Sequence, residues 1–347
     1  MSTMTDATNY PYTRVGLQIP NFTYPGVADA DLFETVATVA TTAERAGADS
    51  VFVMDHFFQL AMLGSPDRNM FEAYTLLGAL GARTSTIRLG TLVTGVTYRQ
   101  PAVLAKQVTT LDVITRGRAL LGIGAAWFEL EHNALGVDFP PLRERFERLE
   151  DAIRICRAMF TEDQSSVTGT HYRTDGAWNH PAPIRAGGPP IMLGGSGEKV
   201  TFRLAAQYAD ELNIIAPISE LPRKLEALHG HLETTGRPKD AVRTSTLLSL
   251  VVGDDDADVD RQLAVLLSNQ GVPDPTGVLS NPDARAQLTQ RVVAGTADAV
   301  SEQLAAIVAV GLDGLIVNLP VDGHDPAYTE RAVTLVRGAV HAAVDRV

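Results

Sequence analysis

The chain has 347 residues, of which 45% are hydrophobic and 20% charged, a composition typical of a globular protein with a large core. Its formal net charge of −12 argues against a nucleic-acid partner and against attraction to anionic membrane surfaces. Because the single cysteine, Cys156, has no internal disulfide partner and residues 1–20 lack a basic-then-apolar leader, we expect a cytoplasmic protein. No uninterrupted apolar run reaches the roughly 18 residues of a membrane-spanning helix.

Eight runs rich in β-branched residues alternate with segments of helical periodicity. The predicted strands are Arg14–Pro20, Ser50–His56, Ile87–Gly95, Arg118–Ala126, Pro190–Gly195, Glu211–Pro217, Val242–Gly253 and Leu312–Pro320. The predicted helices cover residues 29–47, 71–84, 101–115, 142–161, 197–209, 219–236, 297–310 and 327–345. Apolar strands joined by helical crossovers require a parallel sheet covered by helices. Eight such units predict an α/β fold, a (β/α)₈ barrel of the TIM type, formed as one domain by residues 1–347.

Three connections are too long for simple loops and are predicted to be insertions: residues 57–70, residues 162–189 after the fourth strand, and residues 254–295 after the seventh. The second is rich in His, Trp, Tyr, Gly and Pro, which predicts an irregular flap or short strands over a mouth. A mobile lid and a partner contact both remain open for the third. A doubly wound sheet is the alternative fold, but no Gly-x-Gly-x-x-Gly motif follows the first strand.

The second predicted strand ends in two groups capable of proton chemistry, Asp55 and His56. Ligands gather at the carboxyl ends of parallel strands in alternating β/α chains, so the position favours a site. A helix cap followed by a hydrogen-bonded surface imidazole is the more frequent explanation of such a dipeptide. The two residues alone leave both interpretations open.

Small residues end the third and fourth predicted strands. Thr94 and Gly95 close the third, and Gly124 to Ala126 precede the indole of Trp127 at the end of the fourth. Small side chains at this edge leave room for a flat ring. Tight barrel packing, with Trp127 as a plug at the bottom or the rim, explains the same residues equally well.

The fifth predicted strand ends in Gly194-Gly195-Ser196-Gly197 and opens a helix. Backbone N–H groups at such a turn bind phosphate, which suits an acidic protein without a basic patch. Turn geometry alone is the alternative reason for these glycines. His229 and His231 lie inside a predicted helix, where positions i and i+2 point to different faces, so we predict no metal site.

Four motifs together resemble the luciferase-like monooxygenase superfamily, and in particular its branch of coenzyme F420-dependent oxidoreductases. They are Val53–Phe58, Leu89–Pro101, Leu121–His132 and Leu193–Gly197. The resemblance covers about residues 14–345, with the motifs in the family's order. It implies a (β/α)₈ barrel with a deazaflavin or FMN at the carboxyl ends of the strands.

The resemblance also implies roles for individual residues. His56 matches the imidazole that faces the cofactor ring, and is the main catalytic candidate, while Asp55 matches a cofactor-contacting acid. The step from Thr91 to Leu92 matches a non-prolyl cis bulge behind the ring, and Thr94 a polar contact near it. The remaining cofactor-binding candidates border the ring (Gly124, Ala125 and Ala126) or receive a phosphate (Gly194, Gly195, Ser196 and Gly197).

One position departs from the family pattern. Sugar-phosphate dehydrogenases of the family place a catalytic glutamate where this chain has Trp127, which argues against glucose-6-phosphate dehydrogenase activity. Glu129 or Glu131 is a candidate to replace that acid, and an indole favours an apolar or planar substrate. Trp127 and Glu129 therefore join His56 as catalytic candidates.

The expected function is hydride transfer between coenzyme F420 and a small organic substrate, with His56 exchanging the substrate proton. One alternative is an FMN-dependent monooxygenase that uses oxygen and a separate flavin reductase. Another is a flavin- or deazaflavin-binding protein without catalysis. The family resemblance also implies a homodimer.

Overall fold

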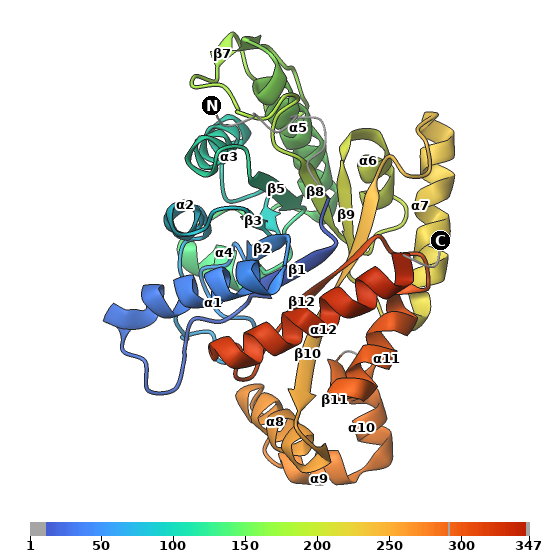
Figure 1. The fold of residues 1–347 in the computed structure, drawn as a ribbon. Helices are drawn as coiled ribbons and strands as arrows, with labels where there is room; N and C mark the ends of the chain where they lie inside the picture. The colour runs from blue at the N-terminus through green and yellow to red at the C-terminus, as the bar shows by residue number, and fades with distance from the viewer. Residues whose placement is uncertain (1–11, 291, 345–347) are drawn as a thin grey trace, which may run out of the picture.

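A parallel barrel of eight strands forms the centre of the molecule. The computed structural model describes residues 12–290 and 292–344 (Figure 1). In barrel order the strands are β1 (Val15–Ile19), β2 (Ser50–Val53), β3 (Arg88–Thr91), β5 (Ala119–Gly124), β8 (Ile191–Gly195), β9 (Glu211–Ile214), β10 (Arg243–Gly253) and β12 (Gly314–Asn318). The pairing of β9 with β10 closes the sheet, and the short β4 (Thr94–Gly95) continues β3 alongside β5. The predicted TIM-type fold is confirmed.

Eight crossover helices surround the barrel: α1 (Leu32–Ala46), α2 (Ala73–Arg83), α3 (Pro101–Thr115), α5 (Leu142–Thr161), α6 (Thr201–Tyr208), α7 (Leu221–Thr235), α11 (Ala297–Val308) and α12 (Pro326–Val344). Each buries an apolar stripe against the sheet, as Val36, Val39 and Ala43 do in α1. Gly47 ends α1 in the left-handed conformation, with φ of +92°, and its N–H bonds back to the last turn.

Apolar side chains also fill the inside of the barrel. Phe52, Leu92, Leu120, Met192 and Ile316 form one buried cluster there, so the lower barrel is a packed core. The free space is found at the carboxyl ends of β1 and β12.

The segment 162–189 contains the predicted short strands, the antiparallel pair β6 (Gln164–Ser165) and β7 (Ala177–Trp178). The prediction that it covers the mouth is wrong. It leads into the amino end of β8, and its hydrogen bonds run to α3 and α5: Asn179 donates to Thr109 and to the Met159 carbonyl. Loops that precede a parallel strand lie at the edge opposite the mouth.

The segment 254–295 forms a small helical lobe beyond the barrel (Figure 1). It consists of α8 (Asp256–Asn269), α9 (Pro275–Ser280), α10 (Pro282–Thr289) and the start of β11 (Val292–Thr296), a strand that the sequence did not indicate. β10 is long enough to reach the lobe, because its outer half pairs with β11 while its inner half pairs with β9 and β12. A separate apolar cluster around Leu263 and Leu266 holds the lobe.

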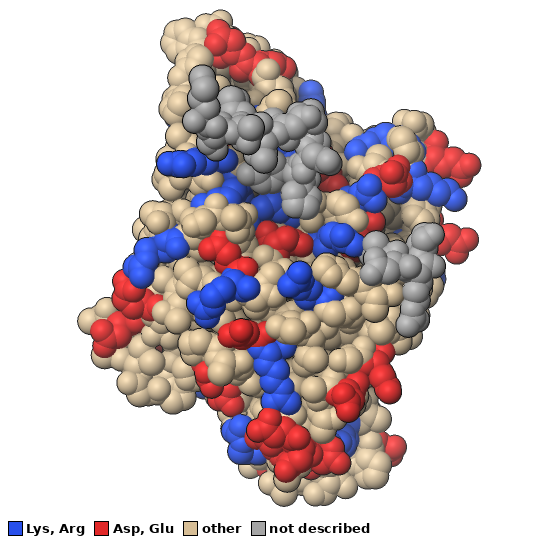
Figure 2. All heavy atoms as spheres, viewed as in Figure 1, with Lys and Arg blue, Asp and Glu red and all other residues tan. Residues whose placement is uncertain are grey.

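Acidic and basic side chains are interspersed over the face of the molecule shown in Figure 2. None of the helices in residues 12–290 and 292–344 combines the length and the apolar character needed to cross a membrane.

Candidate active site

His56 lies just beyond the carboxyl end of β2 and pairs with a carboxylate from another segment. Its Nδ1 atom is 3.0 Å from Oε2 of Glu131, which belongs to the short helix α4 (Glu129–Leu135) after β5. The side chain of Glu131 is fully buried and that of His56 is 12% exposed. The pair therefore stands at the mouth with only the imidazole open to solvent.

Four donors hold the Glu131 carboxylate. Oε1 accepts the backbone N–H groups of Phe57 and Phe58, the latter at 2.7 Å, and Oε2 accepts the hydroxyl of Tyr98 as well as the imidazole. Burial by itself raises the pKa of Glu131, but the hydrogen bonds from His56 and Tyr98 outweigh it, so the pKa lies below its usual range. Glu131 is consequently an ionised acceptor.

This geometry fixes the tautomer of His56. Since an ionised carboxylate can only accept, Nδ1 must carry the proton that points to Glu131. Nε2 has no hydrogen-bond partner within the part of the chain that the structure describes. The nitrogen that can exchange a proton with a ligand is therefore Nε2.

Aromatic rings flank the imidazole. Trp127 and Phe128 meet it edge-on, with ring centroids at 5.9 and 5.7 Å, and stack on each other. Trp127 is 57% exposed, so it is not a plug at the bottom of the barrel. It forms a rim beside His56.

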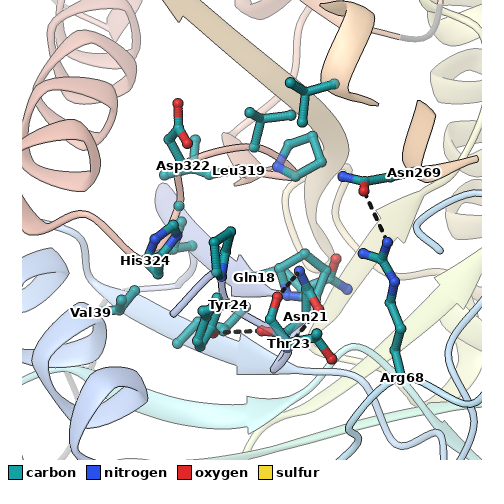
Figure 3. Close-up of a pocket in the computed structure, with 18 residues that line it drawn as sticks. Gln18, Asn21, Thr23, Tyr24, Val39, Arg68, Asn269, Leu319, Asp322 and His324 are labelled. Carbon is teal, nitrogen blue, oxygen red and sulfur yellow. Dashed lines mark hydrogen bonds between the residues drawn. The ribbon is translucent and has the colours of Figure 1, made fainter. Parts of the chain in front are cut away.

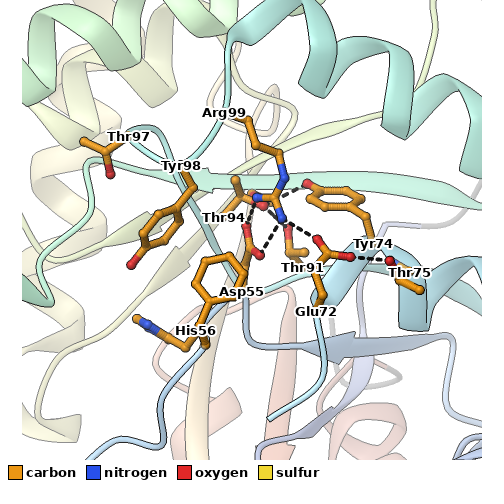
Figure 4. A network of polar contacts seen from close by, with 12 residues as sticks. Asp55, His56, Glu72, Tyr74, Thr75, Thr91, Thr94, Thr97, Tyr98 and Arg99 are labelled. Atoms are coloured by element: carbon orange, nitrogen blue, oxygen red, sulfur yellow. Dashed lines mark hydrogen bonds and ion pairs between the residues drawn. The ribbon is translucent and has the colours of Figure 1, made fainter. Parts of the chain in front are cut away.

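Asp55, by contrast, is buried in an ionic network (Figure 4). Its two oxygens accept from Arg99 at 2.5 and 3.0 Å, and Arg99 also pairs with Glu72 and lies over the ring of Tyr74. Burial raises the pKa of Asp55, and the guanidinium opposes that effect. Asp55 thus ties the 97–99 loop, which carries Tyr98, to the end of β2.

The cis peptide bond joins Leu92 to Val93, so the predicted position, Thr91–Leu92, is wrong by one residue. Glycines make room for the bulge: a Cβ atom on Gly194 or Gly124 would lie 2.8 or 3.0 Å from methyl groups of Val93. The small residues at these strand ends therefore accommodate Val93. Thr91 and Thr94 are buried and hydrogen-bonded to each other at 3.0 Å.

The turn after β8 is present, but the helix that it opens begins at Thr201 and not at residue 197. Gly195 has φ of +149°, which favours glycine, and a Cβ atom on Gly197 would lie 3.0 Å from Oγ1 of Thr201. The carbonyl of Ser196 accepts from Nζ of Lys224 at 2.9 Å, a cation that sequence analysis did not place here. The turn can present backbone N–H groups beside that ammonium.

The acid next to His56 is Glu131 and not Glu129. Glu129 is exposed, and its charge acts to raise the pKa of Arg145. Ala125 and Ala126 are half-buried, and the carbonyl of Ala126 accepts from Arg145. The sequence signal for Glu131 is its place in the motif that also contains Trp127.

Two buried amides at the mouth lack one partner each in the described residues. They belong to Asn213, on β9, and to Asn318, the last residue of β12, and the atom without a partner is Oδ1 in both. Buried acceptors of this kind are almost always satisfied in proteins, so their position favours a polar ligand at this edge.

Comparison with known proteins identifies the family. Residues 13–314 match the luciferase-like monooxygenase model. An F420-dependent glucose-6-phosphate dehydrogenase of Nakamurella multipartita is 34% identical over 234 residues, 66% of either chain, so the alignment spans just under two thirds of that relative. A protein of the same name from Segniliparus rotundus is 29% identical over 337 residues, 86% of this chain and 91% of the relative.

A solved F420-dependent secondary alcohol dehydrogenase, in complex with an F420–acetone adduct, has the same fold. Its TM-score is 0.75 at 21% identity, over 94% of this chain and 99% of that one. The family match covers most of the chain and includes the elements that carry His56, Glu131 and the glycine turn. This chain belongs to the luciferase-like monooxygenase family.

Proposed function

We propose that this chain is an oxidoreductase that uses coenzyme F420 to transfer a hydride to or from a small organic substrate, while His56 exchanges the substrate proton. The observation that carries the proposal is the His56–Glu131 pair at the barrel mouth. The F420-dependent relatives support the choice of cofactor.

The residues at the mouth fit such a cofactor. The backbone of Gly194–Gly197 would receive its phosphate, and the Leu92–Val93 bulge would support its ring. The unpartnered Oδ1 atom of Asn213 would accept a donor from the ligand. When bound, the deazaflavin supplies a carbon atom that gives or takes a hydride.

His56 acts through Nε2. Because Nδ1–H is donated to Glu131, the Nε2 lone pair is directed away from the carboxylate and can take a proton from a substrate hydroxyl. In the reverse direction the protonated ring returns it. The buried carboxylate balances the positive charge on the ring, and the donors around Glu131 keep the ring in one orientation.

Trp127 and Phe128 form an apolar wall beside the reacting proton. Such a wall excludes water and favours a substrate with an apolar or planar part over a phosphosugar. We therefore propose a substrate other than glucose 6-phosphate. The homodimer and the cytoplasmic location stay predictions.

The direct test is turnover of F420, followed by its absorbance, with a panel of alcohols and carbonyl compounds. The wild-type protein should reduce or oxidise F420 with at least one of them, and His56→Gln should lose about 10²–10⁴-fold in kcat. His56→Gln with unchanged kcat would refute the role of His56. Turnover with FMN and oxygen but not with F420 would favour the monooxygenase alternative.

A further inference from the structure

A second feature of the mouth is a cavity of about 290 Å³ beside β1 and β12 (Figure 3). Gln18 and Asn21 line it from the end of β1 and the loop that follows, and Leu319 and His324 line it from the loop after β12. Arg68, from the insertion 57–70, and Asn269, from the insertion 254–295, complete the lining. We call this cavity the chamber.

The chamber is separate from the glycine turn and lies beside the strand that neighbours β2. Around the barrel, β1 stands four strands from β8 in either direction, so the chamber is opposite the proposed phosphate site. β2, which leads to His56, is the immediate neighbour of β1. Gln18 also donates to the carbonyl of Leu92 in the bulge, at 3.1 Å. Gln18 therefore connects the lining of the chamber with the bulge.

The two insertions meet over the chamber. Arg68 donates to Oδ1 of Asn269, at the end of α8, at 2.9 Å, and Gln270 donates to the carbonyl of Met62 at the same distance. Gly64 leaves room for the arginine side chain, because a Cβ atom at position 64 would lie 2.7 Å from Cδ of Arg68. The guanidinium is therefore held in place by residues from both segments.

Charge indicates what the chamber can bind. Arg68 is half-buried, and no carboxylate of residues 12–290 or 292–344 lies within 4 Å of its nitrogens. Asp322, the carboxylate of the lining, is paired with Arg261 at 3.3 Å. Asn21 and Asn269, which also line the chamber, are neutral amides. The exposed carboxyl group of Asp67, next to Arg68 in the chain, is not part of the lining. The lining thus has one permanent cation that a ligand can pair with.

We propose that the chamber binds a small organic compound with one carboxylate group, which pairs with Arg68. A guanidinium recognises a carboxylate through two parallel hydrogen bonds, and the amides supply further donors. A phosphate dianion would call for a second permanent cation. The further inference that this carboxylate belongs to the substrate of hydride transfer rests on the proposed function. The inference that the chamber binds a carboxylate does not depend on that function.

The test is isothermal titration of the full-length protein with benzoate and with benzamide, which has the same shape but no charge. Benzoate should bind at least ~10-fold more tightly, and Arg68→Gln should remove that advantage while leaving benzamide binding unchanged. Gly64→Ala should also weaken benzoate binding, since it displaces the guanidinium but keeps its charge. The control Arg143→Gln removes an exposed arginine far from the lining and should bind as the wild type does.

Equal binding of benzoate and benzamide would overturn the proposal. So would full benzoate binding by folded Arg68→Gln, or by Gly64→Ala if the first variant does not fold. Tighter binding of inorganic phosphate than of benzoate would overturn the choice of a monoanion. F420 binding measured on the same preparation separates the two proposals, because benzoate binding without F420 binding would refute the proposed function alone.

Discussion

Nδ1 of His56 lies 3.0 Å from Oε2 of Glu131, and these two side chains come from segments 75 positions apart. The carboxylate is fully buried and accepts two backbone N–H groups of the His56 loop. One glutamate thus positions both the imidazole and the loop that carries it.

Glu131→Gln should reduce kcat while changing KM little. A glutamine keeps the shape but can donate to Nδ1, so the ring loses its enforced tautomer. By analogy with other residues that orient a catalytic histidine, we expect a fall of about 10–100-fold in activity. Glu129→Gln is the matched control, because Glu129 is exposed and has no contact with His56. Equal losses in the two variants would contradict a specific role for Glu131.

The same substitution should change how stability depends on pH. The pKa of Glu131 is lowered in the folded protein, so the carboxylate contributes stability at pH values above its ordinary pKa of 4.5. That contribution disappears as the pH falls through the lower folded-state value. Denaturant unfolding of wild type and Glu131→Gln should therefore give a larger difference in unfolding free energy at neutral pH than in acid. A difference that stays constant with pH would argue against an ionised Glu131.

Arg99→Gln should destabilise the protein strongly, because it leaves the buried carboxylate of Asp55 without its cation. Removing one partner of a buried ion pair costs about 3–5 kcal/mol. Denaturant unfolding measures this loss. Arg83→Gln, which breaks an exposed pair with Glu34, should change stability much less. Similar effects of the two variants would show that the Asp55 network does not stabilise the fold.

Gly194→Ala should weaken F420 binding, because the new Cβ atom would lie 2.8 Å from Cγ1 of Val93 and displace the bulge. The expected rise in the dissociation constant is about 10-fold, or 1.4 kcal/mol. Gly230→Ala is a suitable control: no atom lies within 4 Å of the added methyl group, and alanine stabilises a helix interior by about 0.5–1 kcal/mol. Unchanged F420 binding in Gly194→Ala would show that the bulge is not part of the cofactor site.

Cys156 should not react with a thiol reagent at pH 8 while the protein is folded. Burial raises the pKa of this thiol to about 12, and the side chain is inaccessible within α5. Labelling before and after addition of denaturant, followed by mass spectrometry, checks this. Rapid modification of the native protein would mean that α5 opens readily from the barrel.

The periodicity of the chain was sufficient to predict the barrel. Most barrel strands are short and largely apolar, and the crossover helices bury apolar stripes, so local pattern and fold agree. β11 was not predicted because its sequence, Val-Val-Ala-Gly-Thr, lies within a polar insertion and pairs only with the extension of β10. Pairing of this kind is decided by contacts far apart in the chain.

The candidate site was predicted only in part, because it too depends on contacts between residues far apart in the chain. His56 is recognisable from its place after a strand, whereas the choice of Glu131 over Glu129 depends on which face of α4 is turned to the barrel. The partnership of Asp55 with Arg99 joins two motifs that sequence alone cannot pair. The cis bond was placed one residue early because Thr91, Leu92 and Val93 offer no local signal that distinguishes the two positions.

Titration of the purified protein with F420 and with FMN in parallel, followed by fluorescence quenching, is the most direct measurement of the proposed function. We expect an F420 dissociation constant of about 1 μM or lower, and FMN binding at least ~10-fold weaker. Tighter binding of FMN than of F420 would contradict the proposal that this chain is an F420-dependent oxidoreductase.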